Sequence, residues 1–271
     1  MMPAAREKSP EGVLRRCWGR KASGFVVVAG VALGWEMACR LGWINSNFLP
    51  PITQVIESLL GLLLSLELIN HGLITLQRIL AGYLLGAAVG YLLGFLCGYL
   101  PRVYETLELT LEYLRPMPSV ALIPIGILFL GIGDALNMVI VAWACSWPVF
   151  VNTMEGVKNT DHVLINTGLT FGYKRWGVIR EIVMPASLPF VFSGLRVSLG
   201  IAVAVAVITE MVASGTGLGS FILQASLSYL IAELYAGIVF IGLLGYSLNR
   251  LFLLVERKAL GWQQGLLLIA K

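Results

Sequence analysis

Long apolar runs recur along the chain and are separated by shorter polar or charged connections. The hydrocarbon core of a bilayer is about 30 Å thick, which an α-helix crosses in about 20 apolar residues. We therefore expect about six transmembrane helices. The runs that predict them are Gly24 to Cys39, Leu73 to Leu100, Val120 to Leu130, Leu136 to Val151, Leu188 to Ala213 and Ile231 to Val255.

The third run, Val120 to Leu130, is short for a straight crossing and contains Pro124 and Gly126. A proline removes a backbone donor, and the resulting break is tolerated in a membrane where neighbouring helices satisfy the freed groups. We expect a tilted or broken helix there.

Glycines occur at every fourth position along the second run. Residues four apart lie on one helical face, and a line of glycines lets another helix backbone approach closely. The pattern predicts helix packing along this face. Its members are Gly82, Gly86, Gly90, Gly94 and Gly98.

The composition agrees with a membrane protein. Of 271 residues, 58% are hydrophobic and 13% charged, whereas soluble domains carry about 25% charged residues. No run of Ser, Pro or charge separates two domains, so we expect one all-α polytopic membrane domain.

Lys and Arg are distributed unevenly over the connections. With the N-terminus inside, all but Arg40, Arg78 and Arg196 fall in cytoplasmic segments, as the positive-inside rule requires. Both termini are therefore predicted to be cytoplasmic, and the net charge of +4 needs no nucleic-acid partner to explain it. The chain then divides into a cytoplasmic tail (1–23), a transmembrane domain (24–257) and a second cytoplasmic tail (258–271).

Several catalytic and nucleotide-binding motifs are missing from the sequence. It has no G-x-x-x-x-G-K-[ST] loop for ATP phosphates, no H-E-x-x-H zinc helix and no G-x-S-x-G elbow. The four cysteines are too widely spaced for a metal site or a redox pair. We expect no catalytic residue, no metal and no nucleotide bound by this chain.

The cytoplasmic connection 152–187 is long for a link that only joins two helices. Thr160 or Asp161 can cap a short helix in it, and Gly172 can end that helix in a left-handed turn. The sequence therefore predicts a short knob with an apolar and small surface. It contains Val163, Leu164, Ile165, Thr167 and Gly168.

A second helix is expected over Tyr173 to Val183. It places Trp176 and Ile179 on the face of Val183, with basic residues elsewhere, and Pro185 and Pro189 should stop it. Basic amphipathic helices often rest on lipid headgroups. From these residues alone, a surface anchor and a docking element for a partner remain equal alternatives.

The stretch N-T-G-L-T-F-G, Asn166 to Gly172, is followed by I-V-M-P, Ile182 to Pro185. This order resembles the cytoplasmic loop of bacterial importer permeases, which reads Glu-Ala-Ala, three residues, Gly, then nine or more residues to Ile-x-Leu-Pro. Asn166, Thr167 and Gly168 replace Glu-Ala-Ala, so one carboxylate of the family pattern is missing here.

Further stretches extend the resemblance in the same order over about residues 24–257. They are F-L-P-P (Phe48 to Pro51), L-R-P-M-P-S-V-A-L-I-P (Leu114 to Pro124), G-I-G-D (Gly131 to Asp134), P-A-S-L-P-F-V-F-S-G-L-R (Pro185 to Arg196), the residues around Glu210, and G-L-G-S-F-I (Gly217 to Ile222). Together they are similar to the permeases of the sulfonate, taurine, nitrate and bicarbonate group of ATP-binding-cassette (ABC) importers.

This resemblance implies the type I ABC importer permease fold and a homodimer in the bacterial inner (plasma) membrane. It also implies two cytoplasmic ATPase subunits that carry ATP and Mg, and an extracytoplasmic substrate-binding protein. The short helix would couple this chain to the ATPase. The residues that the resemblance assigns to coupling are Asp161, Val163, Leu164, Ile165, Asn166, Thr167, Gly168 and Gly172.

Ionisable side chains inside membrane helices are costly, which makes them candidates for function. Arg78 and Glu210 lie at comparable depths near the outer ends of their helices, so we predict that they face the bundle interior and pair. They are candidates for the translocation path or gate, and a fixed pair that only holds two helices together is the alternative. Arg196 is expected to anchor at the cytoplasmic interface, and Glu36 and Arg40 to pair at i,i+4.

Three functions remain in view. The first is a non-enzymatic permease subunit that gives a small anionic solute a gated path, with ATP hydrolysis in separate subunits. The second is a secondary transporter coupled to an ion gradient through Arg78 or Glu210, which should show internal repeats. The third is an intramembrane enzyme, against which the missing motifs argue.

Overall fold

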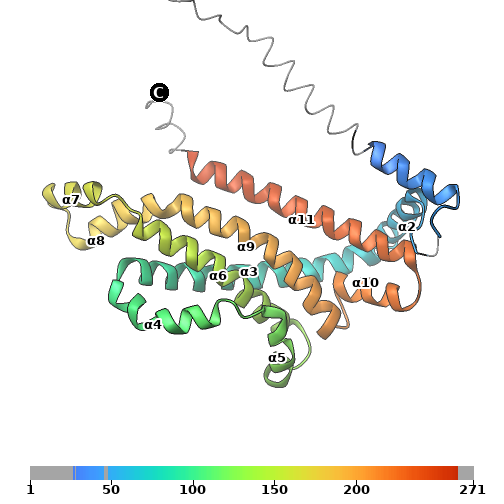
Figure 1. The fold of residues 1–271 in the computed structure, drawn as a ribbon, viewed down its shortest axis with the longest axis horizontal. Coiled ribbons are helices and arrows are strands. Elements are labelled where there is room, and N and C mark those ends of the chain that lie inside the picture. The colour runs from blue at the N-terminus through green and yellow to red at the C-terminus, as the bar shows by residue number, and fades with distance from the viewer. Residues whose placement is uncertain (1–26, 28, 46–47, 262–271) are drawn as a thin grey trace, which may run out of the picture.

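The protein is described by a computed structural model that covers residues 27, 29–45 and 48–261. Over this part of the chain it is helical, without strands, and the long helices run side by side (Figure 1). After a helical segment at 29–40, the elements are α2 (Ile52–Leu64), α3 (Glu67–Tyr99), α4 (Pro101–Leu114), a 3₁₀ turn (Ser119–Leu122), α5 (Ile123–Leu130), α6 (Asp134–Lys158), α7 (His162–Thr170), α8 (Arg175–Val178), a π-helical turn (Ile179–Val183), α9 (Met184–Ala213), α10 (Leu218–Leu227) and α11 (Ile231–Ala259).

Four helical stretches within the described residues are long and apolar enough to cross a membrane. They are α3, α6, the run from α8 through α9, and α11. A fifth span is formed if α4 is taken with Ser119–Leu130, and these two parts are bent by 85° against each other. A broken span is thus confirmed, but the break lies between Leu114 and Ser119, before the run Val120 to Leu130, and α5 continues through Pro124 and Gly126, which were expected to cause it. Part of the expected span Gly24 to Cys39 lies outside the described residues.

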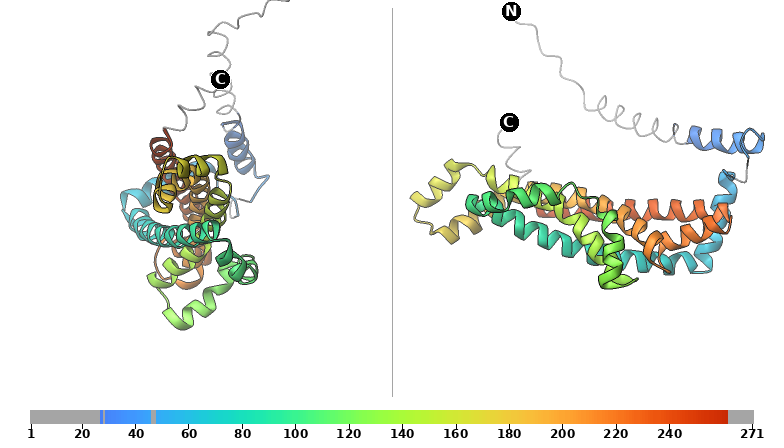
Figure 2. Two further views of the ribbon diagram at one scale, coloured as in Figure 1. Left: turned by 90° about the vertical axis from the view of Figure 1, so that its left-hand side faces the viewer. Right: turned by 60° about the horizontal axis from the view of Figure 1, so that its bottom comes forward.

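The core of the bundle lies between α3, α6 and α9, which pack along most of their lengths (Figures 1 and 2). α11 lies along α9 and also contacts α2 and α10 at the far end of the bundle from α7. The central buried residues are aliphatic or small, apart from Tyr83. They include Ile79, Tyr83, Ile140, Val141, Cys145, Leu199, Ala202 and Ala206.

The glycine face of α3 packs directly on the backbone of α6. A Cβ atom at Gly86, Gly90 or Gly94 would collide with a carbonyl oxygen of α6, whose backbone cannot move aside locally. The predicted role of these glycines in helix packing is confirmed. Close contact of the two backbones makes the α3–α6 pair the most extensive helix contact in the described structure.

Gly90→Ala is expected to lower the stability of the folded protein by about 1–3 kcal/mol, because the added methyl group must push α3 away from α6. Gly61→Ala in α2 is the matched control, since a Cβ there meets no atom within 4 Å. Both substitutions gain the same helix propensity. The thermal midpoint in detergent should therefore fall for Gly90→Ala alone, and equal midpoints for the two variants would contradict the close packing.

One expected helix boundary is wrong. Pro185 and Pro189 do not end a helix, because α8, the π-helical turn and α9 form one continuous run of 39 residues. A π-helical turn shifts the hydrogen-bond register just before Pro185, which accommodates a residue that has no N–H to donate. The same shift separates Trp176, which is exposed, from Val183, which is buried, so these two do not share one face as predicted.

Candidate functional site

Arg78 of α3 and Glu210 of α9 form an ion pair inside the bundle. Arg78 Nη1 lies 2.9 Å from Glu210 Oε1, and their side chains are 3% and 0% exposed. The predicted pairing is therefore confirmed. A role for these two residues in gating or in the translocation path stays a prediction.

Arg78 also binds two groups that the sequence did not single out. Its Nε donates to Asp134 Oδ1 at 2.7 Å, and its Nη1 and Nη2 donate to the carbonyl and the hydroxyl of Thr216 at 2.8 and 3.0 Å. Asp134 begins α6 and its side chain is 66% exposed. One guanidinium therefore joins α3, α6, α9 and the loop before α10, and we call Arg78, Asp134 and Glu210 the charged triad.

Glu210 and its neighbours also hold the start of α10. The Glu210 carboxylate accepts the backbone N–H of Gly219 at 2.9 Å and the hydroxyl of Thr75. Thr75 Oγ1 accepts the N–H of Leu218 at 2.8 Å, and His71 Nδ1 accepts that of Gly217 at 3.1 Å. Three backbone donors at a helix start, which lack partners within the helix, are thus satisfied by side chains of α3 and α9.

The triad has two chemical consequences. Five contacts, two each to Asp134 and Thr216 and one to Glu210, account for the five N–H donors of Arg78, so this residue offers no free donor to a solute. Two carboxylates face one cation, so an anion would be repelled rather than bound. The geometry therefore favours a structural contact that holds these helices together, which we call a latch, over a site that binds an anion.

α7 has the form that the sequence predicts. The Asp161 side chain accepts the N–H of Val163 at 2.8 Å and caps the helix. Gly172 follows the helix with φ +86°, a backbone conformation that glycine adopts without strain. A short capped helix with a fixed end therefore lies at one end of the bundle, beside α8 (Figure 1).

The two faces of α7 differ. Gly168 is buried, and a Cβ there would collide with Ile182, while Ile165 packs on the small core of Val157, Val178 and Val183. The outer side exposes Val163, Leu164, Asn166 and Thr167. Of the residues assigned to coupling, Ile165 and Gly168 thus hold α7 on its support, whereas Asp161 caps the helix and Gly172 ends it. The four residues of the outer side remain free for contact with a partner.

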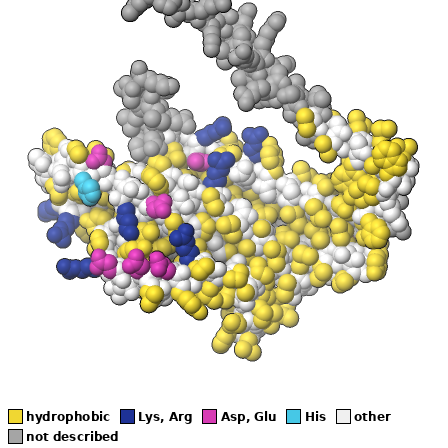
Figure 3. Space-filling view, in the orientation of Figure 1, with side chains coloured by type: hydrophobic (Ala, Val, Ile, Leu, Met, Phe, Trp, Pro, Cys, Tyr) yellow, Lys and Arg dark blue, Asp and Glu magenta, His cyan; other side chains and the backbone are white. Residues whose placement is uncertain are grey.

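Charged side chains gather at the end of the bundle that carries α7. On the face shown in Figure 3, Lys, Arg, Asp and Glu lie mostly over this end and beside the last turns of α11, and hydrophobic side chains cover much of the remainder. A surface of this kind matches a membrane-embedded body with one charged end in water.

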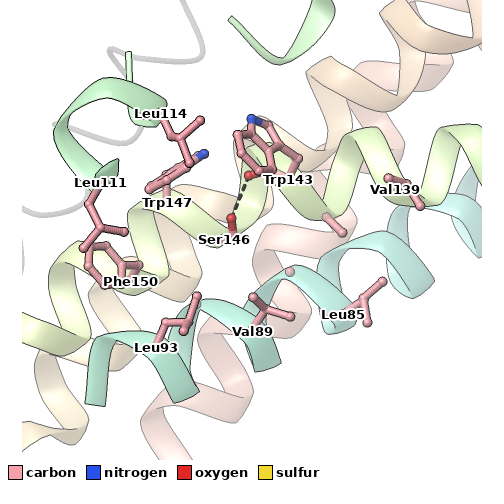
Figure 4. Close-up of a pocket in the computed structure, with 13 residues that line it drawn as sticks. Leu85, Val89, Leu93, Leu111, Leu114, Val139, Trp143, Ser146, Trp147 and Phe150 are labelled. Carbon is pink, nitrogen blue, oxygen red and sulfur yellow. Dashed lines mark hydrogen bonds between the residues drawn. The ribbon is translucent and has the colours of Figure 1, made fainter. Parts of the chain in front are cut away.

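An apolar groove of about 360 Å³ runs between α3, α4 and α6 (Figure 4). Its walls carry Leu and Val from α3, Leu111 and Leu114 from α4, and two tryptophans from α6, Trp143 and Trp147, whose rings meet edge to face with centroids 5.3 Å apart. No charged residue lines it. The groove suits an apolar occupant and offers no ionic partner to an anion.

Comparisons with known proteins agree with this architecture. Residues 90–260 match the family model described as "Binding-protein-dependent transport system inner membrane component". The chain is 30% identical to a putative aliphatic sulfonates transport permease protein of Bacillus subtilis, over 94% of both chains. It is 28% identical to a nitrate import permease protein of Synechocystis, over 85% of this chain and 86% of the relative.

The fold is also similar to solved structures. An inward-facing form of the methionine ABC transporter MetNI superposes with a TM-score of 0.63 at 18% identity, and the match covers 71% of this chain and 96% of that one. At this level of identity the likeness concerns the fold. The predicted all-α permease fold is confirmed by it.

Proposed function

The chain belongs to the binding-protein-dependent transport system inner membrane component family of ABC importer permeases, and from this premise we propose that it carries a small anionic solute into the cytoplasm, driven by ATP hydrolysis in separate subunits. The solute class is that of sulfonate, taurine, nitrate or bicarbonate. Relatives named for aliphatic sulfonates and for nitrate support an oxoanion.

The main support for this function comes from α7. This capped helix presents an uncovered apolar surface at the charged end of the bundle. An apolar helix of this size can fit a groove on a soluble partner. Since the sequence has no phosphate-binding loop, that partner is the ATPase subunit, which holds ATP and Mg. We place this end, and both termini, in the cytoplasm because Lys and Arg concentrate there.

The remaining partners follow from the same premise. A second copy of this chain completes the path, two ATPase subunits dock on the two α7 helices, and an extracytoplasmic substrate-binding protein delivers the solute to the opposite end. The charged triad lies near that opposite end, where it fixes α6 and α10 to α3 and α9. It is thus placed to act as an outer latch.

Uptake measurements test the solute class. A strain without its own sulfonate, taurine, nitrate and bicarbonate importers, expressing the complete transporter, should accumulate one of these labelled anions. Accumulation should stop when ATP is depleted and persist when the ion gradient is collapsed by an uncoupler in cells whose ATP is maintained. Uptake that follows the ion gradient instead would favour a secondary transporter.

The purified chain alone is expected to hydrolyse no ATP, because its sequence has no phosphate-binding loop. Phosphate release should appear only when the ATPase subunit is added. Hydrolysis that survives removal of contaminating ATPases from the isolated chain would contradict this assignment.

A further inference from the structure

Arg196 is a cation without a partner in the middle of a spanning helix. It lies near the centre of α9, its side chain is exposed, and it makes no hydrogen bond or ion pair with the described residues. A charged side chain within a membrane helix is costly, and such residues usually face a partner or a water-filled cavity. Arg196 therefore requires an explanation that the fold alone does not provide.

The expected anchoring role of Arg196 rested on a helix that begins near Pro189. In the structure α9 begins at Met184 and continues the helical run from Arg175, so Arg196 lies about 18 Å from the start of α9 at 1.5 Å per residue. Gly194 packs against Pro148 and Asn152, which places this level beside the inner half of α6. Arg196 thus lies well inside a continuous helical run, further from its start than the sequence suggested.

The uncovered face around Arg196 differs from a lipid-facing surface. Its neighbours on α9 are Ser193, Val197, Gly200 and Ala204, all exposed, and a Cβ at Gly200 would meet no atom within 4 Å. The exposed face of α11, in contrast, carries bulky side chains such as Leu243 and Tyr246. Small residues and a free cation on one face indicate a close approach to a second helix or to a polar path.

Two other cations that lie within spanning helices are already satisfied. Arg78 is held by the charged triad and by Thr216. Arg250 of α11 donates to Tyr246 Oη at 2.7 Å and lies over the same ring. Arg196 alone among these three keeps its donors free.

We propose that Arg196, and not Arg78, is the residue that binds the anionic solute within the membrane. Its planar guanidinium can form two parallel hydrogen bonds to a sulfonate, nitrate or bicarbonate group. The site lies about 21 Å along α9 from Glu210, so a solute that has passed the triad would meet it next on its way inward. This inference rests on the proposed function, and the second copy of the chain forms the opposite wall of the path.

A thiol at position 200 tests the position of Arg196 without knowledge of the solute. In the assembled transporter with the four natural cysteines replaced, Gly200→Cys places a reactive group one turn from Arg196. An anionic and a cationic methanethiosulfonate reagent should both modify it, and Arg196→Gln should lower the ratio of anionic to cationic rates about tenfold. Leu243→Cys, on the bulky face of α11, is the control and should stay unmodified.

Uptake provides the second readout. Arg196→Gln should reduce anion uptake at least tenfold while ATPase association is unchanged, and Arg196→Lys should recover part of it. Arg250→Gln is the matched control and should transport normally.

The results of these experiments distinguish the role of Arg196 from the importer assignment and from the proposed solute class. An unreactive thiol at position 200, a rate ratio that Arg196→Gln leaves unchanged, or normal uptake by Arg196→Gln would overturn the role of Arg196 and leave the importer assignment intact. If the wild-type transporter carries none of the tested anions, the proposed solute class is wrong, and the binding of an anion by Arg196 falls with it.

Discussion

Arg78→Met is expected to destabilise the folded protein by about 3–5 kcal/mol, the largest effect of any single substitution in the charged triad. The reason is that Glu210, whose side chain has no exposed surface, would lose the cation that compensates it in the protein interior. The measurement is the yield and thermal midpoint of the purified protein. Arg40→Met, which breaks the exposed Glu36–Arg40 pair, is the control and should leave the midpoint unchanged.

Two double variants define what the triad requires. Arg78→Met with Glu210→Gln should recover much of the lost stability, because the amide oxygen can still accept the N–H of Gly219 and carries no charge. Arg78→Glu with Glu210→Arg should fail, because arginine has no acceptor for that N–H and a glutamate at position 78 would face Asp134. Full recovery by this charge exchange would show that the network described here is wrong.

Val163→Asp is expected to reduce uptake at least tenfold while the membrane domain stays folded. Val163 is 67% exposed on the outer side of α7, so a carboxylate there costs little in the isolated chain but must be desolvated when a partner groove closes over it. The measurements are ATPase association and uptake at equal expression. Thr170→Asp on the same helix gives a matched control for added charge at a polar position.

Gly168→Trp should impair transport by another route. Gly168 faces Ile182, so a large side chain would push α7 away from its support instead of altering the docking surface. Cleavage by a protease within residues 159–174 should increase for this variant and not for Val163→Asp. Equal protease resistance of the two variants would contradict the inward position of Gly168.

The apolar pattern predicted the spanning helices well in their centres and poorly at their ends. The run Leu73 to Leu100 corresponds to α3, which in fact begins at Glu67. Its first turns are covered by α2 and α10, so they need not be apolar enough to face lipid. Hydropathy indicates whether a helix faces lipid. It therefore does not locate a helix end that is covered by other helices.

The charged triad shows a similar division. Comparable depth along two apolar helices was enough to predict the pair Arg78 and Glu210, because each charge needs a partner. Thr216 comes from a connection and Asp134 is the first residue of α6, so neither lies within the periodic part of an apolar helix. The available signals were that Asp134 is an isolated acid between a glycine-rich turn and an apolar run, and that it ends the G-I-G-D stretch of the family resemblance.

ATP-driven import is tested by transport into vesicles that contain the transporter, isolated through a tag on this chain. ATP and Mg are placed on the side of α7, and the solute with its binding protein on the other. We expect that an oxoanion accumulates only when ATP is hydrolysed, and that Val163→Asp abolishes accumulation while the chain remains folded. Accumulation without ATP that depends on an ion gradient, or normal ATP-driven transport by Val163→Asp, would contradict this expectation.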